Sequence, residues 1–158
     1  MDPSSFELCI SFRDNETNEP IFFKTDGGRF TTSTRTIKLS VGCVYKITIS
    51  CKPWRQLQSL NLSGSELLLN TESEGSAMRY VTHWNTDQQI PSRRATRFDL
   101  LLAVVQDSGP NQKIWQKPLQ AKFYRNNDPH AKYGSKLESL LWKCAEGEKC
   151  EVVDEVFQ

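Results

Sequence analysis

Few side chains in this sequence have the chemistry of a catalytic group. The two histidines, His83 and His130, are far apart in the chain, and the alternation around His83 places it on the outward side of a predicted strand. No cysteine stands in a context that would activate a thiolate, such as a helix N-terminus. The residues therefore predict a protein that is not an enzyme.

Motifs for metals and phosphate loops are also missing from the sequence. Cys144 and Cys150 are six residues apart, without the second close-spaced pair that structural zinc sites use. The turn at 26–28 has two glycines, but it lacks the lysine and the strand–loop–helix setting of a phosphate loop. We therefore expect no cofactor and no metal.

A loop and one aromatic residue are the candidates for binding. Residues 85–97 form the longest stretch without alternation and contain Arg93, Arg94 and Arg97. A solvated loop is the simplest interpretation of these arginines, and an acidic peptide, a phosphoinositide or a phosphate is the alternative. Trp54 follows a proline that ends a strand pattern, so no strand parity buries it, and it is a candidate contact residue.

Length and composition limit the remaining classes. We expect one domain over residues 1–158. The 20 Lys and Arg against 19 Asp and Glu give a net charge of +1, which argues against nucleic acid as a partner. No apolar run approaches the ~20 residues of a membrane span. The start of the chain lacks signal-peptide character and the cysteine count is odd, so we expect reduced thiols and a cytoplasmic location.

Alternating apolar and polar residues predict strands along most of the chain. The clearest case is residues 21–53, where 35–40 and 43–51 both alternate and are joined by Val41 and Gly42. So short a connection predicts antiparallel pairing of the two runs, with Gly42 in the left-handed region. Pro118 within 114–124 requires a bulge, a kink or an edge position. Residues 137–144 fit either a helix start or a strand.

About nine or ten short strands, separated by turns, predict an all-β antiparallel sandwich or barrel. The inward positions of these strands hold bulky apolar residues, which form either a packed core or the lining of an apolar pocket between the sheets. They are Ile37, Leu39, Tyr45, Ile47, Ile49, Trp84, Phe98, Leu100, Leu102, Trp115 and Phe123.

Two blocks of the sequence resemble a known family. Residues 23–30 read Phe-Lys-Thr-Asp-Gly-Gly-Arg-Phe, residues 35–39 read Arg-Thr-Ile-Lys-Leu, and Gly42, Tyr45-Lys46 and Lys52-Pro53 follow. This order and spacing resembles the cannabinoid receptor-interacting protein 1 family. Trp115-Gln116, Lys122-Phe123-Tyr124, His130 and Tyr133-Gly134-Ser135 agree. The chain departs from the family pattern at 117–120, which look like extra residues, at Tyr133, where a tryptophan is expected, and across 54–112.

The resemblance implies a non-catalytic adaptor in the cytoplasm. It would bind the C-terminal tail of a G-protein-coupled receptor, modulate its signalling, and reach the inner face of the plasma membrane through that partner. The implied fold is similar to the immunoglobulin-like Rho GDP-dissociation inhibitor. The alternative function is a carrier for a prenylated or myristoylated protein, such as a lipidated GTPase or G-protein subunit. The candidate partner-binding residues are Arg29, Arg35, Trp54, Arg93, Arg94 and Arg97.

Overall fold

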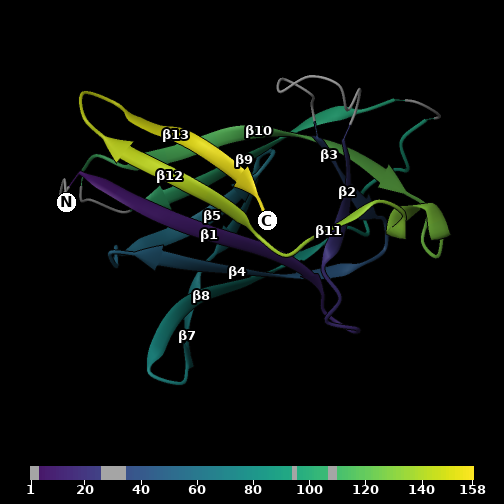
Figure 1. Cartoon of the computed structure of the whole chain (residues 1–158), viewed down its shortest axis with the longest axis horizontal. Coiled ribbons are helices and arrows are strands. Elements are labelled where there is room, and N and C mark those ends of the chain that lie inside the picture. Colours follow the sequence, from purple (N-terminus) through teal and green to yellow (C-terminus); the bar gives the residue numbers. More distant parts are fainter. Residues whose placement is uncertain (1–3, 26–34, 94–95, 107–109) are drawn as a thin grey trace.

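The strands form two packed sheets in the computed structural model, which describes residues 4–25, 35–93, 96–106 and 110–158. One sheet has six strands in the order β13 (Cys150–Phe157), β12 (Leu140–Glu146), β1 (Ser5–Asp14), β4 (Val44–Lys52), β8 (Ala77–Asn85) and β7 (Asn70–Glu74). The other has seven, in the order β11 (Ser135–Leu137), β2 (Ile21–Thr25), β3 (Arg35–Ser40), β10 (Lys113–Tyr124), β9 (Phe98–Gln106), β5 (Leu57–Leu62) and β6 (Ser65–Leu68). Figure 1 shows the two layers.

The predicted all-β sandwich is confirmed, with more strands than the nine or ten expected. Thirteen strands lie in the described residues, because short segments such as 70–74 and 135–137 also pair. The segment left open between helix and strand is strand, divided between β11 and β12. One short 3-10 helix, η1 (Pro129–Lys132), stands in the loop after β10. The sheets are not purely antiparallel, since β3 and β10 pair in parallel.

The predicted pairing of residues 35–40 with 43–51 is wrong. Strand β3 pairs with β2 and β10, whereas β4 pairs with β1 and β8 in the other sheet. The backbone N–H groups of the connection bond to other segments: Val41 N to Tyr124 O (2.9 Å), Gly42 N to Thr86 O (3.3 Å) and Cys43 N to the Thr86 hydroxyl (2.9 Å). Gly42 does have the predicted positive φ, 70°. The short connection is therefore a crossing between sheets.

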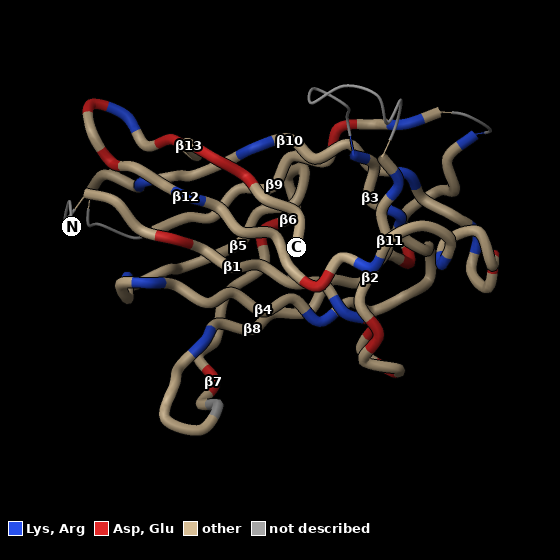
Figure 2. The backbone as a smooth tube through the Cα atoms, in the orientation of Figure 1, with Lys and Arg blue, Asp and Glu red and all other residues tan. Residues whose placement is uncertain are grey.

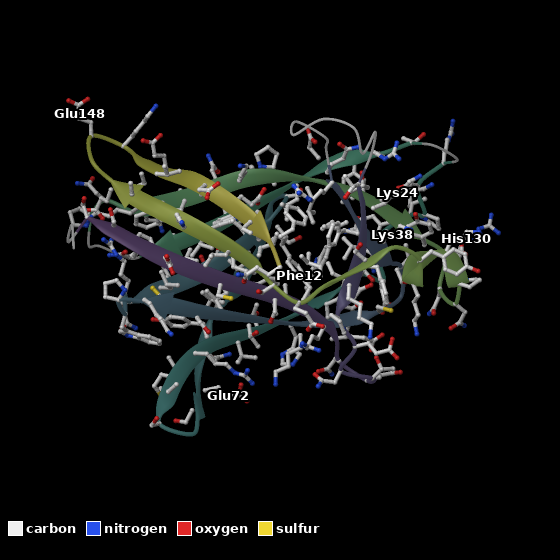
Figure 3. The ribbon with its side chains drawn as sticks, in the orientation of Figure 1. Phe12, Lys24, Lys38, Glu72, His130 and Glu148 are labelled. Atoms are coloured by element: carbon white, nitrogen blue, oxygen red, sulfur yellow. The ribbon has the colours of Figure 1, made fainter. Side chains whose placement is uncertain are left out.

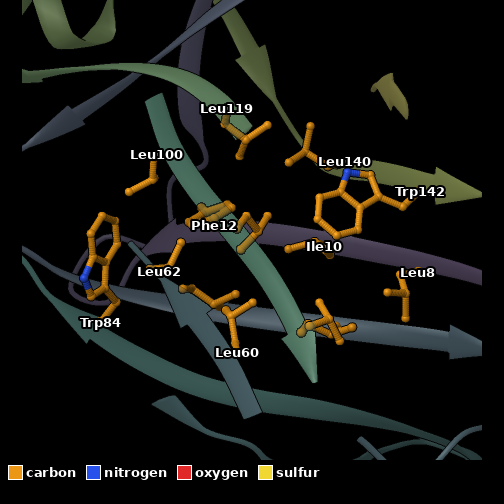
Figure 4. Packing of buried hydrophobic residues seen from close by; sticks show 14 of the residues in the cluster. Leu8, Ile10, Phe12, Leu60, Leu62, Trp84, Leu100, Leu119, Leu140 and Trp142 are labelled. Atoms are coloured by element: carbon orange, nitrogen blue, oxygen red, sulfur yellow. The ribbon is translucent and has the colours of Figure 1, made fainter. Parts of the chain in front are cut away.

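The core lies between the two sheets, where the apolar residues of both inner faces meet (Figure 4). Leu8 and Ile10 of β1 face Leu60 and Leu62 of β5 across this layer, and all four are at most 2% exposed. Burial of such side chains contributes roughly 1.5–3 kcal/mol each. Strand alternation is therefore what turns this sequence into two amphipathic layers.

Pro118 occupies an edge position within β10. The register of β10 on β9 is unbroken from Lys113 to Ala121, and Pro118 lies opposite Leu101. In the described residues, strand β3 pairs with the other side of β10 from Gln120 onwards, so the missing N–H of the proline interrupts none of the pairing that the structure describes there. The extra residues at 117–120 accordingly extend the strand and introduce no bulge against β9.

Candidate functional site

A groove opens on the outer face of the seven-stranded sheet, beside the end of β10. Its volume is about 890 Å³. The floor is formed by β2, β3 and β10, one wall by Pro91, Ser92 and Arg97, and the other by the loop that contains η1. The residues used below are Lys24, Thr36, Lys38, Lys122 and Tyr124 of the floor, Pro91, Ser92 and Arg97 of the first wall, and Arg125, Asp128, His130, Tyr133 and Gly134 of the second.

Strand register puts the floor lysines on one face. Lys38 of β3 lies opposite Lys122 of β10, and Lys24 of β2 lies opposite Thr36 of β3. Their sequence neighbours Ile37 and Phe123 point the other way and are buried in the core. Because successive side chains of a strand alternate between faces, burying the apolar set directs all three lysines outward.

Lys38 holds the second wall against the sheet. Its ammonium donates to the carbonyl oxygens of His130 (3.1 Å) and Tyr133 (2.5 Å), and the residue is only 8% exposed. Partial burial, followed by repulsion from Lys24 and Lys122, lowers the pKa of Lys38. The fold thus places an ammonium group where both solvation and neighbouring charge disfavour it.

The second wall has its own local supports. Asp128 caps η1, with Oδ1 accepting from the His130 N–H (3.0 Å) and lying 2.9 Å from His130 Nδ1. These bonds lower the pKa of Asp128. Gly134 has φ +117°, and a Cβ there would lie 2.5 Å from the Phe23 carbonyl oxygen. Only glycine therefore lets this loop run against β2.

The first wall is attached to β10 and β3. Ser92 N donates to Phe123 O (2.8 Å) while the Phe123 N–H donates to the Ser92 hydroxyl (3.0 Å). Arg97 Nε donates to the Thr36 hydroxyl (3.1 Å), so its guanidinium is anchored over the floor. Both walls are therefore fixed by hydrogen bonds to the strands beneath them.

The charge of the groove differs sharply from that of the chain. Among the described residues, its lining holds five Lys and Arg side chains and a single carboxylate, Asp128, although the whole protein has a net charge of only +1. Figure 3 shows Lys24, Lys38 and His130 at one end of the molecule, and Figure 2 shows basic segments gathered around β2 and β3 there. Such a recess attracts and orients anions.

The sequence candidates for partner binding are separated by the structure. Arg97 lines the groove, and exposed Arg35 lies with its guanidinium carbon 5.3 Å from the Phe157 ring centre. Arg93 is exposed in the first wall segment. Trp54 is at the other end of β4, 44% exposed and stacked on Tyr80 at 4.6 Å. Arg29 and Arg94 lie outside the described residues.

The predicted inward residues all belong to the core or pack against it. Phe98 is only partly buried, and the other ten are at most 5% exposed. At the groove end, Phe123 stacks on Phe98 (5.2 Å) and lies 6.1 Å from Trp84, which in turn lies 6.1 Å from Tyr45. These side chains contact one another across the interior. No observation in the described part of the chain favours a bound lipid there.

Sequence reasoning missed most of the groove. His130 looked like a surface loop residue, while Lys24, Lys38 and Lys122 were three isolated polar positions on separate strands. The sequence does indicate that these lysines point outward from their strands. This indicates a common site only once β2, β3 and β10 are known to be neighbours. The described residues contain no group of three or more His, Cys, Asp or Glu that could hold a metal ion.

No helix in the described residues is long and apolar enough to cross a membrane.

Comparison with known proteins identifies relatives over nearly the whole chain. The family model of CB1 cannabinoid receptor-interacting protein 1 matches residues 2–157. The proteins of that name from Homo sapiens and Mus musculus are each 28% identical to this chain over 152 residues, which cover 92% of this chain and 90% of each relative.

Proposed function

Since this chain belongs to the CB1 cannabinoid receptor-interacting protein 1 family, we propose that it is a non-enzymatic adaptor that binds the C-terminal tail of a cannabinoid-type G-protein-coupled receptor and modulates its signalling. The relatives are named for an interaction with the CB1 receptor. The names of these relatives support a receptor as the partner, and we propose the groove as its binding site.

The basic groove is the observation that carries the binding mode. Its open trough lies across three strands, and the part of its lining that the structure describes holds five cationic side chains against one carboxylate. An extended tail segment rich in Asp and Glu would place its carboxylates over the floor lysines and between the two walls. Charge complementarity of this kind mainly raises the association rate and makes affinity depend on salt.

Tail binding is tested with a labelled synthetic peptide of the CB1 receptor C-terminal tail and fluorescence anisotropy. The groove variant is Lys122→Ala with Arg125→Ala. Its control is Lys143→Ala with Lys149→Ala, which removes equal charge from exposed positions on β12 and the following hairpin. We expect the groove variant to bind about tenfold more weakly, about 1.4 kcal/mol, with a shallower salt dependence.

Two results would contradict the proposal in different ways. If wild-type protein does not bind the tail at all, the function itself is wrong. If the groove variant and its control bind as tightly as wild type, the tail binds elsewhere and the groove loses its role.

A further inference from the structure

The floor of the groove holds a pair of ammonium groups in fixed positions. Lys38 and Lys122 face each other on neighbouring strands, and their Nζ atoms lie 5.7 and 5.2 Å from the centre of the same Tyr124 ring. The two carbonyl bonds of Lys38 fix its position further. The ring and the carbonyls therefore organise two positive charges before any ligand arrives.

The described residues place few carboxylates beside these charges. Among the described residues, no carboxylate lies within ion-pair distance of Lys24, Lys38, Lys122 or Arg125. Among the described lining residues Asp128 is the one carboxylate: it is hydrogen-bonded to His130, and at longer range it also interacts with Lys122, which contributes to the lowered pKa of Asp128. Adjacent cations repel one another, so a bound anion would relieve a cost already present in the folded protein.

A phosphomonoester fits this arrangement better than a single carboxylate does. Near neutral pH it carries a charge of about −1.5 to −2 and three acceptor oxygens. Its several oxygens allow it to accept from more than one of the lining cations, which include Lys38 and Lys122 beside the Tyr124 ring as well as Lys24 and Arg125. One carboxylate, with a single charge, would leave part of the cluster unmatched.

Exposed apolar side chains beside the groove indicate that the phosphate-bearing ligand is part of a membrane. Ile90, which directly precedes Pro91 of the first wall, is 81% exposed, and Tyr133 of the second wall is 55% exposed. An isoleucine so fully in water gains nothing for the fold. Apolar and aromatic side chains next to a basic surface are typical of proteins that enter the headgroup layer of a membrane.

We propose that the groove binds the phosphorylated inositol head group of a membrane phosphoinositide, with Ile90 and Tyr133 entering the lipid interface. This site goes beyond the receptor-tail interaction, because it requires no receptor. Where both ligands are present, they compete for the same lysines. The lipid would then regulate how much of the groove is free for a tail.

The test is co-sedimentation of the protein with vesicles of three compositions: phosphatidylcholine alone, phosphatidylcholine with phosphatidylinositol 4,5-bisphosphate, and phosphatidylcholine with phosphatidylserine at the same surface charge. We expect binding to the phosphoinositide vesicles to be at least tenfold tighter than to the phosphatidylserine vesicles. Equal binding to both would mean attraction to charge alone and would overturn the proposal.

Variants locate the site. Lys24→Ala with Lys122→Ala should weaken phosphoinositide binding at least tenfold, while Lys143→Ala with Lys149→Ala should leave it unchanged. Thermal melts show whether each variant is folded. If the two pairs have equal effects, the groove is not the site.

A comparison of vesicles with a soluble head group shows whether the phosphate belongs to a membrane lipid. Ile90→Ser should reduce vesicle binding severalfold but leave binding of soluble inositol 1,4,5-trisphosphate, measured by calorimetry, unchanged. Binding of the soluble trisphosphate without vesicle binding would exclude the membrane. Binding of a phosphorylated receptor-tail peptide without vesicle binding would make the ligand a phosphopeptide, against the proposal.

Vesicle binding is measured without any tail peptide. A failure of lipid binding can therefore be distinguished from a failure of tail binding.

Discussion

Replacing Thr86 by valine should weaken the crossing between the two sheets. Thr86 follows β8, is fully buried, and has a hydroxyl that accepts from the Cys43 N–H (2.9 Å) and donates to the Ser40 carbonyl (2.7 Å). Valine has nearly the same shape but cannot make either bond. Thr86→Val thus leaves a donor and an acceptor without partners at the point where the chain passes from β3 to β4.

The cost follows from the two abandoned groups. A buried polar group left unsatisfied costs about 1–3 kcal/mol, and both groups here are only partly buried. We therefore expect the free energy of unfolding of Thr86→Val to be about 2–4 kcal/mol lower than that of wild type, with an unchanged urea m-value.

Thr86→Ser is the matched variant, because it keeps the hydroxyl and loses only a methyl group. Its free energy of unfolding should stay within about 1 kcal/mol of wild type. Equilibrium urea denaturation followed by tryptophan fluorescence measures both. If Thr86→Val is as stable as wild type, or if Thr86→Ser loses as much, the hydroxyl does not support this crossing and the explanation given for it is wrong.

Three further outcomes follow from other positions. Gly134→Ala should lower the melting temperature more than Gly64→Ala, because both have positive φ but only Gly134 meets a backbone oxygen; equal losses would argue against the close approach to β2. Burial raises the pKa of Cys144 from 9.0 to about 12, so its contribution to stability is complete below pH 9 and is lost as pH rises towards 12. Between pH 8 and 10.5 the free energy of unfolding of Cys144→Ala should therefore fall by about 2 kcal/mol less than that of wild type, as measured by urea denaturation at each pH. If the free energy of unfolding changes equally with pH in both proteins, this explanation is wrong. Trp54→Ala should leave receptor-tail affinity unchanged, because the length of β4 separates it from the groove; a weaker complex would move the tail site to that end.

Local patterns in the sequence predicted most of the elements and their faces. The run 43–51 alternates with a period of two, and the structure buries its apolar side as expected. Gly42 was predicted in the left-handed region as part of a tight turn between two paired strands; its φ is positive as predicted, although the two strands do not pair. These features depend on a few consecutive residues, so one sequence is enough to read them.

The assignment of each strand to one sheet or the other depends on contacts between residues that are distant in the sequence. The alternation of β3 and β4 would suit a hairpin within one sheet as well as a crossing between two, since both arrangements bury the same side chains. The crossing is distinguished from the hairpin by the hydrogen bonds that Thr86 and Tyr124 accept from the connection between β3 and β4. Both residues are far from that connection in the sequence.

The groove arises in the same way. The alternation within each strand directs Lys38 and Lys122 away from the core, because both sequence neighbours of each are apolar, and Lys24 follows the apolar Phe23. It could not bring them together, since they belong to three strands whose order, β2-β3-β10, includes a parallel pair joined by no short connection. The face to which a strand side chain points follows from local alternation. Which charged side chains become neighbours depends on the pairing of distant strands, and that pairing exists only in the folded sheet.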